Sequence, residues 1–413
     1  MKTILFVINT LGYGGAERAM LDLFDVIDPE QYEISLFVLT GQGELSHVLP
    51  EHVQLLNQDY KDVSVLTRKG RRLLFRSVMK VGIGKGLFLR RALYLLKNVW
   101  NMCKKGKICP DKLCWRLLSD GAPVIEKEYD LAVAYLEGGA TYYVADHVKA
   151  KKKAAFVHID YGKAGYGRDL DRDCYEKIDW IFTVSDEVTE HFLEVYPECE
   201  QKISVLHNQV NQQRVLQLAE NGNGFEDDFQ GTRILTVGRL TEQKRYDVAI
   251  QAMALLKEKC DVPVRWYVLG EGELRHSLQQ QIKDAKLENE FFLLGVKKNP
   301  FPYYKNCDLY VHATGFEGKS IAIQEAQTLG KPILATDCSG NREQIEHGVD
   351  GCLCELTPEA VSEQILWMIQ HPDECRNYGE KAAKKVLYQP KELEQLLDLA
   401  EGKNPTLSEI QNS

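Results

Sequence analysis

The sequence has no long hydrophobic stretch, few prolines and no excess of positive charge. No uninterrupted apolar run approaches the roughly 18 residues that a membrane-spanning helix requires. With only 13 prolines and 44% hydrophobic residues, the 413-residue chain is neither collagen-like nor largely disordered. Its net charge of −9 argues against a surface that binds nucleic acid. We therefore expect globular folding, in about two or three domains at roughly 150 residues each.

The cysteines and the N-terminus both bear on the compartment. Eleven cysteines occur, and none belongs to a C-x-x-C pair of the kind found in zinc and redox sites. Their odd number and scattered spacing favour free thiols, and thus a reducing compartment. The opening MKTILFVINT resembles a signal peptide only weakly, because no small-residue cleavage site precedes Gly14. A first buried strand is favoured, and the protein is expected to be cytoplasmic.

Short apolar runs alternate with amphipathic segments of helical period, which is typical of parallel sheets covered by crossover helices. The runs form two series. The first lies at residues 3–8, 33–39, 53–56, 131–135, 154–158, 180–184 and 203–206, and the second at 233–237, 265–269, 291–294, 309–312, 332–336 and 351–354. This pattern predicts an α/β chain of two doubly wound domains, with their ligand-binding loops facing across a cleft.

Composition sets the expected domain boundaries. The Gly/Asn/Asp-rich stretch 220–231 separates the two series and predicts a loop or linker. We therefore predict an N-terminal domain at 1–207, a linker at 208–231, a C-terminal domain at 232–388, and a final helix and tail at 389–413.

Residues 61–125 form a basic insertion in the first series, with 16 Lys and Arg against three acids. A helical wheel places apolar residues on one arc and polar or basic residues on the other. The apolar arc holds Leu89, Ala92, Leu93, Leu96, Val99, Trp100 and Cys103, and the opposite arc holds Arg90, Arg91, Lys97, Asn101, Lys104 and Lys105. Two interpretations stay open and can hold together. The insertion packs on its own domain with a solvated charged face, or it docks on anionic lipid with Trp100 and leucines at the interface.

A glycine-rich turn follows the first predicted strand. Gly12, Gly14 and Gly15 let the backbone approach a ligand, and the amides of the helix that follows attract an anion such as phosphate. The dinucleotide fingerprint would need glycine where Glu17 stands, so NAD binding loses support. A merely structural tight turn is the alternative.

Charged residues follow two strands of the second series. Arg239 comes directly after Gly238, and Lys244 lies at the mouth of the next helix, a pair that suits a nucleotide diphosphate. Glu317 lies in a strand-end loop and Glu325 within a helical pattern, where carboxylates can accept hydrogen bonds from sugar or ribose hydroxyls. Taken alone, the pair of cations is equally compatible with solvated surface, and two glutamates at this spacing recur by chance in any Glu-rich chain.

Taken in order, several segments resemble the retaining glycosyltransferases of family 4. They are the loop with Gly14, Gly15 and Glu17, then GRLTEQKR, VLGEGELR, FFLLGVKKN and EGKSIAIQEA with the G-K-P after it. The resemblance extends over nearly the whole chain. It implies the GT-B fold, with an acceptor-binding N-terminal domain and a donor-binding C-terminal domain.

The resemblance also implies roles for single residues. Arg239 and Lys244 would bind the diphosphate, Glu325 the ribose hydroxyls and Glu317 hydroxyls of the donor sugar. The remaining implied donor-binding residues, including the backbone that holds the base, are Gly14, Gly15, Gly238, Leu294, Gly295, Val296, Gly318, Lys319 and Ser320. This chain has Lys319-Ser320 where many members have Phe-Pro, which leaves the sugar open.

Two features of the first half remain. His158 ends a predicted strand and is expected to contact sugar or acceptor. Similar enzymes have a histidine in this region, and a core histidine is the alternative. Asp169, Asp171 and Asp173 have the D-x-D spacing that binds metal in another glycosyltransferase fold. Here we expect them at a solvated helix start. With no Cys/His cluster of zinc spacing, no metal and no cofactor are predicted.

These expectations combine into one function. The chain is expected to transfer a sugar with retention from a nucleotide-diphosphate sugar, UDP favoured, to a saccharide or lipid-linked acceptor in bacterial surface polysaccharide synthesis. A nucleotide-sugar epimerase or hydrolase, and a non-catalytic nucleotide-sugar-binding protein, are the alternatives. Residues 61–125 would hold the protein peripherally on the anionic inner face of the cell membrane, and no nucleic acid is expected as a partner.

Overall fold

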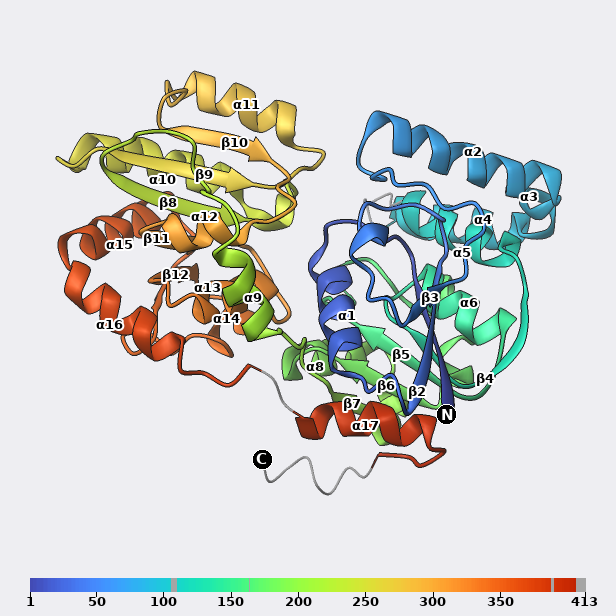
Figure 1. The fold of residues 1–413 in the computed structure, drawn as a ribbon. Coiled ribbons are helices and arrows are strands. Elements are labelled where there is room, and N and C mark those ends of the chain that lie inside the picture. The colour runs from blue at the N-terminus through green and yellow to red at the C-terminus, as the bar shows by residue number, and fades with distance from the viewer. Residues whose placement is uncertain (105–109, 163, 388–389, 406–413) are drawn as a thin grey trace. The chain divides into compact units, whose positions relative to one another are not determined.

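The computed structural model describes residues 1–104, 110–162, 164–387 and 390–405 and divides into two compact units (Figure 1). The first unit comprises Met1–Asn208 together with Gln389–Ser413, and the second comprises Gln209–Tyr388. Each unit has a parallel sheet at its centre. The predicted pair of doubly wound domains is therefore confirmed.

The first sheet has seven strands in the order β3-β2-β1-β4-β5-β6-β7. They are β1 (Lys2–Ile8), β2 (Tyr32–Val38), β3 (Val53–Leu55), β4 (Ile125–Ala134), β5 (Val148–Val157), β6 (Trp180–Thr183) and β7 (Ile203–Val205). Each of the seven was predicted. However, β4 and β5 begin at 125 and 148 rather than at 131 and 154, because their polar first halves also pair with each other.

Both faces of this sheet are buried, as expected for a parallel sheet covered by crossover helices. Along β1, Ile4, Phe6 and Ile8 enter one hydrophobic core, whereas Leu5 and Val7 enter the other. The covering helices are α1 (Gly15–Val26), α6 (Gly139–His147), α7 (Arg168–Asp171), α8 (Asp186–Val195) and α17 (Pro390–Ala400), with 3-10 turns η1 (Ser46–Val48), η2 (Tyr175–Lys177) and η3 (Pro197–Lys202).

The C-terminal helix α17 belongs to the first unit, although the whole second unit precedes it in the chain. Leu393, Leu396 and Leu399 enter the core that lines β1 and β4. Glu392 accepts hydrogen bonds from both the backbone N–H and the Nδ1 of His207, at 2.7 and 2.6 Å. This helix therefore closes the first unit.

The basic insertion is largely helical in its described residues, whereas Lys105 of the predicted basic arc lies outside them. It contains α2 (Arg68–Gly84), α3 (Leu87–Arg90), α4 (Ala92–Lys104) and α5 (Pro110–Gly121), and α5 packs on both α2 and α6. The insertion does pack on its own domain, as one of the two interpretations expects, but the predicted apolar arc is not the side that packs. Leu89 and Leu93 are each 85% exposed, while Asn98 and Met102 on the opposite side are buried. Polar contacts fix this orientation: Asn98 Nδ2 donates to the Asp169 carbonyl, and Tyr94 Oη to the Leu170 carbonyl.

The second sheet has six parallel strands in the order β10-β9-β8-β11-β12-β13. In chain order this is the 3-2-1-4-5-6 arrangement of dinucleotide-binding sheets. The strands are β8 (Thr232–Val237), β9 (Val264–Leu269), β10 (Phe291–Gly295), β11 (Leu309–His312), β12 (Ile333–Thr336) and β13 (Cys352–Cys354). The helices are α9 (Gln212–Ala219), α10 (Tyr246–Lys259), α11 (Arg275–Asp284), α12 (Phe301–Asn306), α13 (Ile321–Thr328), α14 (Ser339–Arg342), α15 (Pro358–Gln370) and α16 (Pro372–Ala382), with the turn η4 (Glu242–Lys244).

The predicted linker at 208–231 is corrected in its first half. Residues 212–219 form α9, which packs on α12 and α13 and is part of the second unit. Its start is fixed by Asn211, whose side chain accepts a hydrogen bond from the Arg214 backbone N–H. Residues 220–231 contain neither helix nor strand, as predicted, but Asp227 binds Arg233 and Arg265 and so anchors this loop to the sheet.

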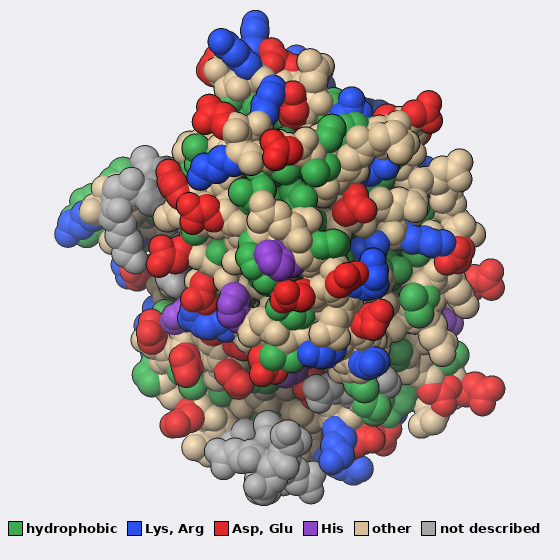
Figure 2. Space-filling view, turned by 90° about the vertical axis from the view of Figure 1, so that its left-hand side faces the viewer, with side chains coloured by type: hydrophobic (Ala, Val, Ile, Leu, Met, Phe, Trp, Pro, Cys, Tyr) green, Lys and Arg blue, Asp and Glu red, His purple; other side chains and the backbone are tan. Residues whose placement is uncertain are grey.

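The remaining composition-based expectations concern membranes, thiols and charge. Within the described ranges, no helix combines the length and apolarity that crossing a membrane requires. Ten cysteines in the described residues are free thiols, and Cys109 lies outside those residues. Figure 2 shows acidic and basic side chains interspersed on one face of the molecule, without a large patch of either sign there.

Candidate functional site

The predicted donor residues of the second unit lie where its strands end. Because β8, β10 and β11 belong to one parallel sheet, their carboxyl ends meet at one edge. Gly238 and Arg239 follow β8, Leu294 and Gly295 end β10, and Val296 follows directly. His312 ends β11, and the loop that carries Glu317 comes next. The fold thus gathers segments that are far apart in the sequence.

Lys244 and Glu317 are in direct contact at this edge. The Lys244 ammonium forms an ion pair with Glu317 Oε1, and both side chains are mostly buried. Gln243 ties the two loops together, since its Nε2 donates to the Phe316 carbonyl at 2.8 Å and its own carbonyl accepts from the Gly315 N–H at 2.8 Å. Lys244 also lies across Gly238, where an added Cβ would be 3.4 Å from its Cε. A Cβ at 238 would therefore contact this lysine and lie closer still, at 3.2 Å, to the Tyr246 hydroxyl.

The electrostatics of the pair keep Glu317 ionised. Burial by itself would raise the pKa of this carboxyl, but the Lys244 ammonium and a hydrogen bond with His312 lower it to about 2. His312 is 1% exposed, and burial followed by the Lys244 charge lowers its pKa. At neutral pH the site therefore combines a carboxylate, an ammonium and a neutral imidazole.

Glu325 lies deeper, on the buried side of α13. Its Oε2 accepts a hydrogen bond from the Tyr304 hydroxyl at 2.9 Å. The helix begins at Ile321, directly after Lys319 and Ser320, so backbone amides open toward the strand-end loops. The two glutamates are therefore one loop carboxylate and one helix carboxylate, in the arrangement that the sequence predicts.

The other predicted residues of the second unit differ in exposure. Arg239 is exposed beside the end of β8. Gly295 is buried with a φ of 74°, a left-handed conformation that favours glycine. Val296 beside it is 40% exposed, while Gly318 is buried. A rim that combines an exposed cation with an accessible apolar side chain can accommodate both a phosphate and a flat base.

Gly14, Gly15 and His158 belong to the first unit. Gly14 caps α1, which begins at Gly15. The His158 backbone N–H donates to Glu137 Oε2 at 3.2 Å, and its ring packs against Tyr135 and Phe156. Burial lowers the pKa of His158 to about 4. This histidine is therefore neutral at pH 7 and can exchange hydrogen bonds without carrying charge.

The D-x-D expectation is wrong for its central residue. Asp171 is fully buried, and its carboxylate accepts hydrogen bonds from the hydroxyls of Tyr142, Tyr161 and Tyr196 at 2.8 to 2.9 Å. Burial raises the pKa of Asp171 to about 6, even though these bonds oppose the shift. The aromatic cluster around α7 lies in distant segments, which is why local polarity suggested solvent instead.

One acidic group has the spacing of a metal site but the partners of an ion-pair network. The ligand atoms of Asp146, Asp173 and Cys174 lie within 4.8 Å of one another. Arg116 and Lys177 already contact Asp146, and Lys177 also contacts Asp173. Burial raises the pKa of the Cys174 thiol to about 11. These groups are already neutralised, so the donor set does not favour a cation.

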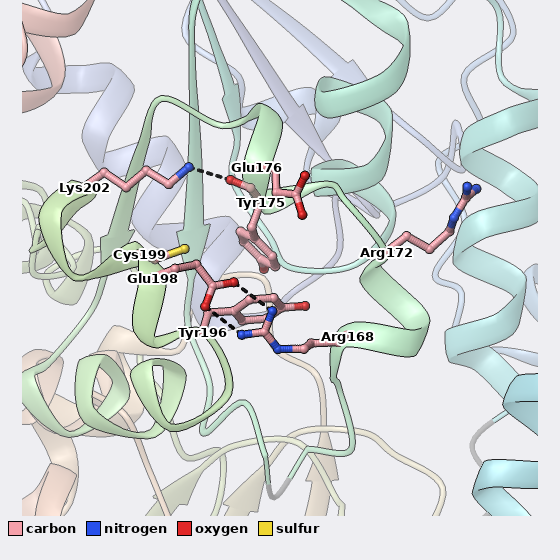
Figure 3. Close-up of a pocket in the computed structure, with 8 residues that line it drawn as sticks. All are labelled: Arg168, Arg172, Tyr175, Glu176, Tyr196, Glu198, Cys199 and Lys202. Carbon is pink, nitrogen blue, oxygen red and sulfur yellow. Dashed lines mark hydrogen bonds and ion pairs between the residues drawn. The ribbon is translucent and has the colours of Figure 1, made fainter.

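A pocket of about 260 Å³ lies elsewhere in the first unit, between α7, η2 and η3 (Figure 3). Figure 3 shows the Arg168 guanidinium facing the Glu198 carboxylate, with two hydrogen bonds at 2.8 and 2.7 Å. Lys202 donates to the carbonyls of Tyr175 and Ile178. Because these cations are engaged, the pocket has little to offer a nucleotide diphosphate.

The sequence analysis did not identify three buried residues that lie beneath the edge where the carboxyl ends of β8 and β11 meet: Tyr304, Tyr310 and His312. His312 follows the same rule that identified His158, a histidine at the end of a buried strand. The two tyrosines are ordinary core residues by pattern, and only their hydrogen bonds reveal a link to the site.

Residues 226–385 match the family model described as Glycosyl transferases group 1. The chain is 30% identical over 211 residues to the Campylobacter jejuni N-acetylgalactosamine-N,N'-diacetylbacillosaminyl-diphospho-undecaprenol 4-alpha-N-acetylgalactosaminyltransferase, covering 51% of this chain and 56% of that one. It is 36% identical over 150 residues to the amylovoran biosynthesis glycosyltransferase AmsK of Erwinia amylovora, covering 34% and 37%.

A solved structure extends the likeness to both units. Anabaena HepE, determined in complex with UDP and glucose, superposes with a TM-score of 0.67 at 17% identity, covering 97% of this chain and all of that one. The two curated relatives, in contrast, match over little more than half of their own length or less. Residues 226–385 thus match the group 1 glycosyltransferases, and the chain as a whole has the GT-B fold.

Proposed function

We propose that this protein is a glycosyltransferase that moves a sugar from a nucleotide-diphosphate sugar, favoured as a UDP-sugar, to an acceptor hydroxyl. The contact between Lys244 and Glu317 carries the proposal. It brings together, at one edge of the matched domain, a cation and a carboxylate that can accept hydrogen bonds from sugar hydroxyls. The UDP and glucose bound to HepE support the choice of donor.

In this proposal, Lys244 and Arg239 hold the diphosphate and stabilise the negative charge that grows on it as it leaves. Glu317 accepts hydrogen bonds from donor-sugar hydroxyls, and Glu325 from the ribose. The bond between the anomeric carbon and the diphosphate oxygen breaks, and the acceptor oxygen bonds to that carbon from the same face. The departing diphosphate takes the acceptor proton. Because the acceptor attacks from the face that the diphosphate leaves, the anomeric configuration is retained. The two cations supply the charge stabilisation, and no metal is required.

The test compares charge removal inside and outside the site. Lys244→Ala should lower kcat by about 10²- to 10³-fold, as does loss of a group that stabilises the transition state. Glu317→Ala should lower kcat to a similar extent. Lys283→Ala, which removes an exposed lysine of α11, should leave kcat unchanged. Activity of Lys244→Ala and Glu317→Ala at the wild-type level would contradict the site. The anomer of the product, determined by NMR, tests retention.

The two rivals are separated by incubating donor without acceptor. A nucleotide-sugar epimerase or hydrolase would convert UDP-sugar rapidly, at a rate that acceptors do not change. A non-catalytic binding protein would be stabilised by UDP-sugar without releasing UDP. Glycosyl transfer instead predicts slow UDP release alone and a large increase with acceptor.

We further propose that the acceptor is lipid-linked, as the name of the Campylobacter relative indicates for that enzyme. The exposed face of α3 and α4 supports a site at a membrane surface. Leu89, Leu93, Leu96 and Trp100 follow one another at helical spacing with 57 to 85% of each side chain exposed. Residues 68–104 contain 11 Lys and Arg and no acid. An exposed apolar stripe in so basic a segment fits an anionic bilayer.

A groove of about 450 Å³ borders this stripe at Leu93. Five cations line it against the single acid Asp169: Arg90, Arg91, Lys97, Arg168 and Arg172. Lys97 is paired with Asp169, and Arg91 with Asp120, while Arg90 and Arg172 are exposed. Lipid phosphates can therefore be held beside the inserted leucines.

Flotation with vesicles tests this face. Wild type should float with vesicles that contain anionic lipid at low salt, and much less with zwitterionic vesicles or at high salt. Leu93→Glu should abolish flotation, whereas Leu216→Glu, a matched change of an exposed leucine on α9, should not. Absence of flotation at low salt, or unchanged flotation of Leu93→Glu, would contradict membrane docking.

A further inference from the structure

A chain of buried side chains runs beneath the edge where the carboxyl ends of β8 and β11 meet, and it connects Glu317 with Glu325. His312 Nε2 lies 3.1 Å from Glu317 Oε1, and His312 Nδ1 lies 3.1 Å from the Tyr310 hydroxyl. The rings of Tyr310 and Tyr304 are 5.2 Å apart, and the Tyr304 hydroxyl donates to Glu325 at 2.9 Å. Each of these three linking residues is at most 1% exposed.

We propose that His312 is a positioning residue, which holds the Glu317 carboxylate in place through a neutral imidazole that carries its proton on Nε2. The proposal rests on the proposed function, because Glu317 is its point of action. A carboxylate can only accept, so the imidazole nitrogen that faces it must donate. The Tyr310 hydroxyl then donates to the unprotonated Nδ1 and fixes this tautomer.

The sheet holds this arrangement rigidly. His312 and Tyr310 are two residues apart on β11, so their side chains lie on the same face of the strand. Their rings stack at 6.0 Å with an interplanar angle of 28°, and His312 is paired in register with Ala335 of β12. The imidazole therefore has little freedom to leave Glu317.

The charged and polar groups around His312 explain why a neutral donor suits this position. Lys244 Nζ and Ser320 Oγ each lie 3.4 Å from Nε2, beside Glu317. When a diphosphate draws the Lys244 ammonium away, Glu317 would be left as a buried charge without a partner. His312 keeps one hydrogen bond on the carboxylate at that moment, so Glu317 stays oriented toward the sugar while Lys244 serves the leaving group.

Kinetics provide the first test. His312→Leu removes the donor and should lower kcat/KM for UDP-sugar about 10- to 100-fold, the scale of one hydrogen bond to a charged group. The affinity for UDP alone should stay within about 2-fold, a split that a generally damaged site would not show. His312→Gln places an amide donor near Nε2 and should recover most of the loss. In a Glu317→Ala background, His312→Leu should have no further effect.

Nitrogen-15 NMR of labelled histidine tests the tautomer independently of activity, with His312→Gln to assign the signals. Wild type at pH 7 should show His312 protonated on Nε2 only, and Tyr310→Phe should disturb that state. A charged ring, an Nδ1-protonated ring, or additive losses in the double variant would overturn the proposal. If wild type shows the expected tautomer but transfers no sugar, the proposed function fails instead.

Discussion

At the scale of single residues, the candidate site depends on the pairing of opposite charges in a largely buried position. The ion pair between Lys244 and Glu317 is mostly buried, so each charge needs the other when no donor is bound. His312 and Gln243 add hydrogen-bond donors to the same carboxylate. A change of one partner should therefore cost more stability than a matched change of both.

The first prediction concerns this pair. Lys244→Met should lower the unfolding free energy of the second unit by about 1–3 kcal/mol, because it leaves Glu317 with hydrogen bonds alone. The double variant with Glu317→Gln should be closer to wild type. Urea unfolding followed by hydrogen exchange in β8 and β11 measures both. A double variant that loses as much stability as Lys244→Met, or more, would show that an unpaired Glu317 charge is not what destabilises the single variant.

The second prediction uses the pKa of His158, which burial lowers to about 4. In the unfolded chain the imidazole titrates at about 6.5, so between these values the unfolded state binds more protons. Stability from this residue is thus present above about pH 6.5 and falls as the pH drops toward 4, by about 2 kcal/mol between pH 7 and pH 5.

His158→Gln should remove this part of the acid sensitivity of the first unit. Its unfolding free energy, compared at pH 7 and pH 5, should change less than that of wild type. His47→Gln, which replaces an exposed histidine of the same unit, serves as the control. The same acid loss in His158→Gln and wild type would mean that His158 does not titrate as its burial indicates.

At the scale of elements, the helices have two distinct tasks. Some close a core: α17 returns to the first unit and buries Leu393, Leu396 and Leu399 there. Others expose apolar surface: α3 and α4 turn Leu89 and Leu93 outward and are held by polar contacts on their inner side. Helices of the first kind contribute to stability. Those of the second kind leave apolar area in water, which is typical of a surface that binds a partner or a membrane.

The third prediction tests α17 as a closing element. Leu396→Ala should destabilise the first unit by about 2–5 kcal/mol, as is usual for a fully buried leucine, and leave the second unit unchanged. Glu394→Ala, an exposed change on the same helix, should have little effect. Hydrogen exchange resolved by unit distinguishes these outcomes. Destabilisation of both units alike would contradict the assignment of α17 to the first.

At the scale of the whole molecule, the same order of six parallel strands occurs in both sheets, with a seventh strand added in the first. The strand-end residues of the two sheets are chemically different. The second unit offers Arg239, Lys244 and Glu317, and the first offers His158 with Glu137. Under the proposed function we therefore expect a division of labour, in which the second unit binds the charged donor.

The fourth prediction is that UDP stabilises mainly the second unit. At a concentration about 100 times its Kd, UDP should add about 2.7 kcal/mol to the unfolding free energy of the unit that binds it. Hydrogen exchange of the full chain should show protection near 238–244, 294–296 and 312–325. Protection confined to the first unit would show that UDP binds there and would contradict the prediction.

The sequence by itself determined the two series of strands, their α/β class and the order of the motifs, because side-chain periodicity and strand-end residues are local properties. It identified both Lys244, at the mouth of a helix, and Glu317, in a strand-end loop, as candidate site residues. It did not reveal their contact, which depends on β8 and β11 being neighbours in the sheet.

Tertiary structure alone decided three further points. It buried Asp171 among three tyrosines, turned the apolar arc of the insertion outward, and joined α9 and α17 to units that their sequence positions did not indicate. It also linked Glu317 to Glu325 through His312, Tyr310 and Tyr304. Each depends on packing between segments far apart in the chain, where burial and hydrogen-bond partners come from residues that no local pattern identifies.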